Sequence, residues 1–335
     1  MDWGKSKTNL SGKDSLLLIG WDGGTRPVLL KLLAEKKLPN LQALIDEGSF
    51  VETEIDEDQT ETKPQWSQIL TGYNSSVHGV FSNLNYGPIP KGLTVFERIY
   101  EKYGKDITFA FISGKINNVS FRGPHDICTN CMFRLPDKNN KKLPWGFVSE
   151  KSKIEFALDT APTRRGQRRI IQKRDGQPYY TLYQTGIVKF MLNSLNEGDN
   201  VLKYFNGIVD DLTRGRYFAF LHFEEPDEQG HQFGESSAEY INAILQNDRR
   251  LGEVIAKLKQ LGRYNKTALV VTTDHGFDEG LKSHFNAHHT FLVSNLTHLK
   301  KTSIPKNVTP TILDFFGVDT SRFAIKLKGQ SLISR

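Results

Sequence analysis

The run Ser15-Leu-Leu-Leu-Ile-Gly-Trp21, followed at once by Asp22-Gly-Gly24, decides the fold of this chain. Its apolar side chains do not alternate with polar ones, and glycines close it. This pattern is typical of a strand buried on both faces of a parallel sheet. Asp22 would then lie at the carboxyl end of that strand. Because open α/β sheets bind their ligands at this end, the run also marks a candidate site.

The rest of the chain alternates strand-like and helix-like segments, which predicts strands covered by helices on both faces. We therefore expect a three-layer α/β/α sandwich with a mostly parallel central sheet. Further strands are predicted at residues 107–113, 216–223, 268–273 and 291–294. Helices are predicted at residues 27–37, 41–47, 94–103, 185–195, 200–214, 237–261 and 309–317.

We expect the 335 residues to form one domain, 1–335, with an inserted cap or lid region at 115–184 outside the sheet. Periodicity is poor across the insertion, and long irregular insertions in compact domains usually carry function. It contains the only two cysteines, Cys128 and Cys131, as a lone Cys-x-x-Cys. Because a structural zinc site needs four ligands, we interpret them as a redox-capable pair or as packing residues.

The formal net charge of +6 is strongly local, because residues 164–174 carry six basic side chains and no acidic one. One interpretation is a solvated loop or helix face. The other is an electropositive rim that attracts an anionic substrate. Nucleic-acid binding is not indicated, because no recognised nucleic-acid motif accompanies this run.

The composition, with 38% hydrophobic and 24% charged residues, is that of a soluble globular protein. No apolar run approaches the roughly 20 residues that cross a bilayer, so no membrane span is expected. The first residues, Met1-Asp-Trp-Gly-Lys-Ser-Lys-Thr-Asn9, lack the apolar core of a secretory signal. We therefore expect a cytoplasmic location, or secretion if a leader has been trimmed.

A second informative stretch, Thr62-Lys-Pro64-Gln-Trp-Ser-Gln-Ile-Leu70, predicts a helix. Thr62 is a preferred N-cap residue, and Pro64 is tolerated in the first helical turn. Backbone N–H groups and the helix dipole favour anions at a helix N-terminus, so a phosphate beside Thr62 would be stabilised. The alternative is an ordinary capping threonine.

Acidic residues and histidines follow three of the predicted strands. The first strand ends at Asp22, the second runs into Glu224-Glu-Pro-Asp227-Glu-Gln-Gly-His231, and the third into Asp274-His275-Gly276, with His284 further on. Carboxylates and imidazoles are ligands of zinc or manganese. The alternative, unrelated surface polar residues, is disfavoured because such clusters recur at successive strand ends.

These residue types suggest chemistry at phosphorus. Two cations about 4 Å apart clamp the attacking and leaving oxygens of an in-line displacement. A cation bound to Thr62 would lower the pKa of its hydroxyl and make it a nucleophile. The amide of Asn83 would donate to a non-bridging oxygen and stabilise its growing charge.

The chain resembles the alkaline phosphatase superfamily, and most closely its type I phosphodiesterase/nucleotide pyrophosphatase branch. That branch carries a threonine–proline nucleophile segment, then Thr-Gly, His-Gly and an asparagine at matching spacing. Its Pro-Asp-x-x-Gly-His and Asp-His-Gly motifs also occur, and the last predicted helix resembles the superfamily's closing helix. The matching residues are Thr62-Lys-Pro64-Gln, Thr71-Gly72, His78-Gly79, Asn83, Pro226-Asp227-Glu-Gln-Gly-His231 and Asp274-His275-Gly276.

The resemblance implies two divalent metal ions, with zinc expected first and manganese as the alternative. One ion would be held by a first set of residues, and the other by a second set that includes a third histidine. We favour His284 for that histidine over His288 and His289, because its sequence context resembles the shorter superfamily members. The first set is Asp22, Thr62, Asp274 and His275, and the second is Asp227, His231 and His284.

The resemblance also implies that Thr62 forms a covalent phospho-threonine intermediate, with Asn83 and the Thr62 N–H holding phosphoryl oxygens. Departures from the branch occur at Lys63, Gln65 and Trp66, which are expected to shape the substrate pocket. Other polar residues are given ordinary roles. We expect His78 to be structural and His222 to be a packed strand residue. Glu224 and Glu225 are expected to be solvated carboxylates, with a place beside the second metal as the alternative.

The leading hypothesis is a metal-dependent phosphodiesterase or nucleotide pyrophosphatase that acts on a small phosphate ester, with a nucleotide as one candidate. A phosphomonoesterase or phosphomutase would share the metals and differ in the pocket. A catalytically silent binding protein on this scaffold would not need all the metal-type residues together. A sulfatase is disfavoured because the Cys-x-Pro-x-Arg motif is absent.

Overall fold

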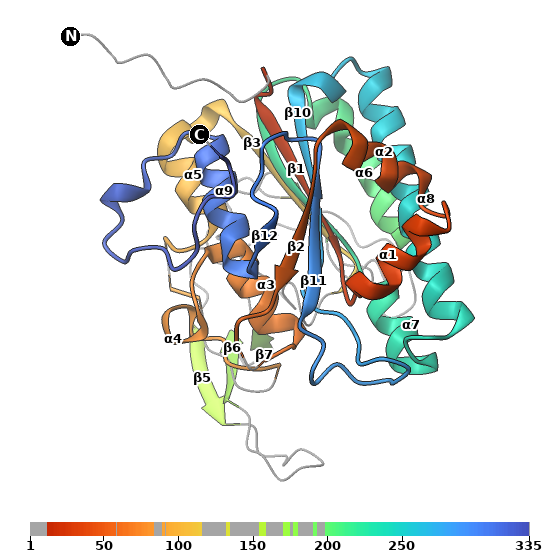
Figure 1. Cartoon of the computed structure of the whole chain (residues 1–335). Coiled ribbons are helices and arrows are strands. Elements are labelled where there is room, and N and C mark those ends of the chain that lie inside the picture. The colour runs from red at the N-terminus through yellow and green to blue at the C-terminus, as the bar shows by residue number, and fades with distance from the viewer. Residues whose placement is uncertain are drawn as a thin grey trace, which may run out of the picture.

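The computed structural model describes residues 12–57, 59–83, 89–90, 92–115 and 198–334 in full. Between 116 and 197 it describes the backbone of five short strands. Figure 1 shows the arrangement of the elements. Both cysteines, Cys128 and Cys131, and residues 164–169 of the basic run lie outside the described residues.

A nine-stranded sheet forms the middle of the molecule, in the order β12-β2-β11-β10-β1-β9-β3-β8-β4. Neighbouring strands are parallel except at the pairs β10–β11 and β11–β2. The mostly parallel sheet expected from the sequence is therefore confirmed. In sheet order the strands are Thr302–Ser303, Ser49–Glu54, His289–Ser294, Thr267–Thr272, Ser15–Trp21, Tyr217–Phe223, Thr108–Ser113, Phe190–Leu192 and Met132–Arg134.

Strand β1 is central because every one of its residues is buried. It pairs in parallel with β10 on one side and β9 on the other. Successive side chains of a strand point to opposite faces. Accordingly, Leu16 and Leu18 pack into one apolar cluster, whereas Leu17 and Ile19 pack into the other. An all-apolar strand is satisfied only when both faces of the sheet are covered.

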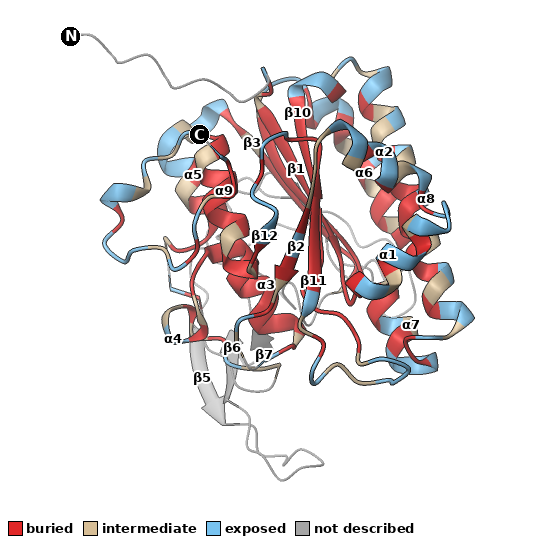
Figure 2. Cartoon of the chain, in the orientation of Figure 1, coloured by how far each residue is buried: buried red, intermediate tan, exposed pale blue. Residues whose placement is uncertain are grey.

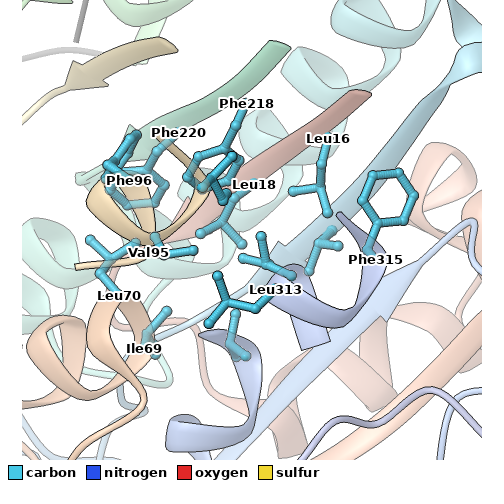
Figure 3. Close-up of a cluster of buried hydrophobic side chains, with 14 of the residues drawn as sticks. Leu16, Leu18, Ile69, Leu70, Val95, Phe96, Phe218, Phe220, Leu313 and Phe315 are labelled. Atoms are coloured by element: carbon cyan, nitrogen blue, oxygen red, sulfur yellow. The ribbon is translucent and has the colours of Figure 1, made fainter. Parts of the chain in front are cut away.

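Helices cover both faces of the sheet (Figures 1 and 2). On one face lie α3 (Thr62–Thr71), α5 (Val95–Tyr103) and α9 (Val308–Phe315), whose side chains share a cluster with Leu16 and Leu18 (Figure 3). The other face carries α1 (Arg26–Ala34), α2 (Pro39–Glu47), α6 (Gly198–Leu212) and α8 (Ala238–Gln260). Two further helices are α4 (Ser75–His78) and α7 (Glu225–Phe233).

These layers confirm the expected three-layer α/β/α sandwich. Figure 2 shows that the central strands of the sheet are buried, whereas the outer faces of the helices are exposed, and every residue of β1, β9 and β10 is buried. Among the helices of the described part of the chain, none combines the length and the apolar character that crossing a membrane requires.

The region from 115 to 197 differs from expectation. The helix predicted at residues 185–195 is wrong at 190–192, which form β8, because a short apolar run pairs equally well beside a neighbouring strand. The insertion does not lie wholly outside the central sheet, since β4 pairs with β8 at its edge. Strands β5 (Ile154–Leu158), β6 (Ile170–Arg174) and β7 (Gln177–Tyr179) form a separate three-stranded sheet.

His78 has the structural place that the sequence analysis gave it. It is the last residue of α4, it is fully buried, and its Nδ1 accepts the N–H of Val80 at 3.2 Å. Burial lowers the pKa of His78 from 6.5 to about 3, and the charge of Lys306 adds to this effect. The folded protein therefore holds this imidazole neutral, whereas the unfolded chain protonates it below about pH 6.5.

Because the unfolded state then binds more protons, acid should destabilise the fold through His78. The linkage predicts a loss of about 2 kcal/mol in the free energy of unfolding from about pH 7.5 to about pH 5. In His78→Asn this part of the pH dependence should disappear, as measured by urea unfolding at both pH values. The matched control is His298→Asn, at an exposed histidine with positive φ that asparagine tolerates. An unchanged pH dependence in His78→Asn would contradict the assignment.

Candidate active site

The candidate residues meet at the carboxyl edge of the sheet. Parallel strands β1, β9 and β10 end side by side, and Asp22, α7 and Asp274 follow them directly. Helix α7, which the sequence analysis had not predicted, begins two residues after β9 with a proline and several acidic residues in its first turn. These residues favour a helix start. Asp227 and His231 are four residues apart on α7 and so share one face.

The first group consists of Asp22, Asp274 and His275, whose ligand atoms lie within 4.8 Å of one another. All three residues are buried. Thr62 lies beside this group, with its Oγ1 3.3 Å from His275 Nε2. Thr62 is the first residue of α3 rather than its N-cap, which is Glu61. The expected cap is thus wrong by one residue, and the hydroxyl faces the histidine instead.

The second group consists of Asp227, His231 and His284. His231 Nε2 lies 3.3 Å from Asp227 Oδ1 and 3.2 Å from His284 Nε2. The other two candidate histidines are engaged elsewhere: His288 contacts the Ile55 carbonyl, and His289 pairs with Glu54. The structure therefore places His284, and neither of the alternatives, in this group.

The two groups adjoin each other. The rings of His275 and His284 are stacked, with centroids 4.1 Å apart. His275 Nε2 also lies 3.6 Å from Asp227 Oδ1 and 3.9 Å from Asp22 Oδ1. This proximity is what two cations in one reaction centre require.

Two of the three histidines, His275 and His231, are oriented as metal ligands are. Nδ1 of His275 lies 2.9 Å from the Gly276 carbonyl, and Nδ1 of His231 lies 2.9 Å from the Lys282 carbonyl. Donation from Nδ1 fixes the tautomer and turns the lone pair of Nε2 toward the groups. In addition, Asp227 Oδ1 and Asp274 Oδ2 are buried without a hydrogen-bond partner among the described residues. The donor set thus fits divalent cations.

Asp22 is held by two residues that the sequence analysis did not connect with it. His222 Nε2 lies 2.7 Å from Asp22 Oδ2, and Trp66 Nε1 donates to the same oxygen at 3.1 Å. His222 is a packed residue of β9, as expected, and in addition it bonds Asp22, which the sequence did not indicate. Trp66 is fully buried and supports Asp22 from within the fold, instead of lining a substrate pocket.

Lys115 is a further site residue that sequence reasoning missed. Its Nζ lies 2.9 Å from Asp22 Oδ1 and also bonds Asp227 Oδ2, which joins the two groups. The available signal was its place directly after a predicted strand, the position that had singled out the aspartates. This signal is weak for Lys115, because the residue also opens the irregular insertion.

Burial and neighbouring charges shift the pKa values of several side chains in the two groups. Burial would raise the pKa of Asp22, yet Lys115 and His222 lower it to about 2. Burial and the neighbouring Asp22 raise the pKa of Asp274 to about 7. The pKa of His284 falls to about 3 because of burial and the neighbouring His275. Strongly perturbed groups at a sheet edge are typical of functional sites.

The two glutamates after β9 are not solvated as expected. Glu224 is buried, and burial together with the charge of Glu228 raises its pKa to about 8. Glu225 makes an ion pair of 2.7 Å with Arg250. Glu224 lines a hollow of about 570 Å³ that lies beside the second group. The residues that line this hollow are Lys115, Glu224, Asp227, Glu228, His231 and Gln232.

Asn83 is held next to the start of α3. Its Oδ1 accepts the backbone N–H of Lys63 at 2.9 Å, and its carbonyl accepts from Lys63 Nζ at 3.0 Å. Because its amide oxygen is engaged, the NH₂ group is the part of Asn83 that can donate to a ligand. Lys63 is buried and helps to hold Asn83 in place.

The sequence model of the family described as type I phosphodiesterase / nucleotide pyrophosphatase matches residues 16–328. The chain belongs to this family. Its matched region contains every residue of both groups, Thr62 and Asn83.

Among the curated relatives of this chain, the mouse bis(5'-adenosyl)-triphosphatase enpp4 is 24% identical to it over 282 residues. The aligned residues cover 83% of this chain and 50% of that protein. The chain therefore spans about half the length of the curated relatives it matches. The venom phosphodiesterase of Naja atra is 30% identical over 118 residues, which cover 33% of this chain and 13% of that protein.

A solved structure of murine ectonucleotide pyrophosphatase / phosphodiesterase 5, inactive and in complex with AMP, has a TM-score of 0.54 and 14% identity. The structural alignment covers 95% of this chain and 98% of the solved chain. This likeness shows the shared fold.

Gly20 gives Trp66 its place over β1 and so supports Asp22. A Cβ at Gly20 would overlap the Trp66 ring and come within 3.1 Å of Phe220. Gly20→Ala should therefore lower the free energy of unfolding by about 1–3 kcal/mol, measured by urea denaturation. The matched control is Gly215→Ala, where a Cβ meets nothing within 4 Å. Equal stability of the two variants would show that the close packing of Trp66 on β1 is not required.

Proposed function

We propose that this chain hydrolyses phosphate diesters or nucleotide pyrophosphates, with Thr62 as nucleophile and two divalent cations. The observation that carries the proposal is the position of Thr62. Its hydroxyl is buried at the N-terminus of α3 and lies 3.3 Å from His275 of the first group, which adjoins the second. A helix N-terminus stabilises an anion at this point.

The residues that would hold the cations are the two groups described above, with Thr62 added to the first. When bound, such cations lower the pKa of a coordinated hydroxyl and stabilise charge on phosphoryl oxygens. Zinc suits this mixed carboxylate and imidazole set, and manganese is the alternative.

The chain's own residues then account for the chemistry. Thr62 Oγ1 would lose its proton to solvent and form a bond to phosphorus while the bond to the leaving oxygen breaks and that oxygen takes up a proton. The product is a phospho-threonine that still carries the second ester group of a diester substrate. Water then hydrolyses the bond to Thr62, which releases the phosphate monoester and restores the hydroxyl. Asn83, fixed by its bonds to Lys63, would donate its NH₂ group to a non-bridging oxygen and stabilise the charge that develops there.

For the substrate we propose a small phosphate ester of the nucleotide type. The support comes from the relatives: one group is named for the hydrolysis of bis(5'-adenosyl)-triphosphate, and a solved relative holds AMP. The hollow beside the second group, about 570 Å³, is of a size to take part of such a ligand.

The first test combines elemental analysis with hydrolysis of bis-p-nitrophenyl phosphate and of p-nitrophenyl phosphate. We expect about two zinc or manganese ions per chain and faster hydrolysis of the diester. Removal of the metal with a chelator should abolish turnover, and its return should restore it. A preference for the monoester would assign the chain to phosphatases or phosphomutases. Absence of both metal and turnover would favour a silent scaffold.

The role of Thr62 is tested by Thr62→Ala, with Thr62→Ser as the matched variant that keeps the hydroxyl. Loss of the nucleophile should lower kcat by about 10³-fold or more. The serine variant should keep measurable activity and form the phosphorylated residue, detectable by mass spectrometry after rapid acid quenching. Full activity in Thr62→Ala would refute the covalent route.

A further inference from the structure

Lys115 is placed by the sheet. Strand β3 runs parallel to β9, and the pairing Ser113↔His222 ends the described register. Gly114 extends this ladder by donating its N–H to the His222 carbonyl at 3.1 Å. Lys115 therefore leaves the sheet beside the end of β9, at the edge where both groups lie. Its position follows from backbone pairing and not from a flexible surface loop.

The ammonium of Lys115 contacts one carboxylate from each group. Nζ lies 2.9 Å from Asp22 Oδ1 of the first group and bonds Asp227 Oδ2 of the second. The side chain of Lys115 is 19% exposed, while those of Asp22 and Asp227 are 0% and 6% exposed. Charges in such surroundings interact far more strongly than pairs on an open surface.

At Asp22, the oxygen that Lys115 binds is the one that a cation would need. At Asp227, Lys115 bonds Oδ2 and lies beside Oδ1, which has no hydrogen bond in the described chain. Asp22 Oδ2 already accepts from Trp66 and His222, which leaves Oδ1 as the oxygen available for a cation. Lys115 binds that oxygen. An ammonium and a divalent cation repel each other, so both cannot occupy the same carboxylate oxygen.

We propose that Lys115 is an internal competitor for the divalent cations: it bridges Asp22 and Asp227 in the metal-free protein and is displaced when both groups fill. The inference rests on the cation centre of the proposed function. It adds two effects of Lys115. The ammonium weakens the apparent affinity of the site for cations, and it neutralises the two carboxylates as long as no cation is bound. The hollow lined by Glu224 and Glu228 offers the displaced ammonium other acidic side chains nearby.

The test compares the wild type with Lys115→Met, which removes the charge and keeps the length of the side chain. Zn²⁺ is titrated into chelator-stripped protein by isothermal calorimetry, with a competing chelator for tight sites. We expect Lys115→Met to bind Zn²⁺ at least about tenfold more tightly, because Lys115 would occupy the carboxylates in about nine tenths of metal-free molecules. The metal-free variant should also have a lower Tm than the metal-free wild type. The matched control, Lys203→Met at an exposed lysine of α6, should match the wild type.

A second measurement uses only the wild-type protein and so does not depend on folding of the variant. Lysines are acetylated briefly with and without Zn²⁺, and each site is quantified by mass spectrometry. Displacement from the carboxylates should raise the acetylation of Lys115 when Zn²⁺ is present, with Lys203 unchanged.

Each outcome is decisive for one of the two claims. Weaker or equal Zn²⁺ binding in Lys115→Met, or unchanged Lys115 acetylation, would overturn the competition while leaving the cation centre intact. If the wild type bound no Zn²⁺ or Mn²⁺ at all, the cation centre of the proposed function would fail, and the competition with it.

Discussion

The buried carboxylates of Asp22, Asp227 and Asp274 are the constraint on which the rest of the site depends. Burial of like charges is costly unless cations or donors compensate for it. The fold supplies compensation from several directions: Trp66 and His222 bond one oxygen of Asp22, and Lys115 bonds Asp22 and Asp227. These contacts leave lone pairs of two carboxylates without hydrogen bonds in the described chain, which is the arrangement that divalent cations satisfy.

The sheet turns distant segments of sequence into one site. Strands β1, β9 and β10 are parallel neighbours, so their carboxyl ends deliver acidic residues and histidines from three parts of the chain to one edge. Helix α3 begins at this edge on the face of the sheet that does not carry α1, α2, α6 and α8. All ten of its residues are buried. The threonine at its first turn is thereby placed beside His275 in buried surroundings, which favours a preorganised nucleophile.

The sequence was informative where a local pattern has one physical meaning. The apolar run before Asp22 can only be buried on both faces, so it specified a central parallel strand. The same logic found Asp274 and His275 after β10. Local sequence patterns were not sufficient where the role of a residue depends on its partners in space. The sequence around His222 gives no sign of the bond to Asp22. The apolar residues 190–192 form a strand because β3 lies beside them. Helix α7 was missed because its glutamates and proline also suit a loop.

The sequence by itself therefore determined the fold class through its periodicity, and its motifs indicated the family, because both are properties of the chain alone. The division of the candidate ligands into two sets was implied by the resemblance to that family. Only the tertiary structure shows that His284, and neither His288 nor His289, lies beside Asp227 and His231. It also revealed Lys115 between the two groups and the buried state of Glu224. Contacts between residues 93 and 112 positions apart depend on packing in three dimensions, which no local pattern encodes.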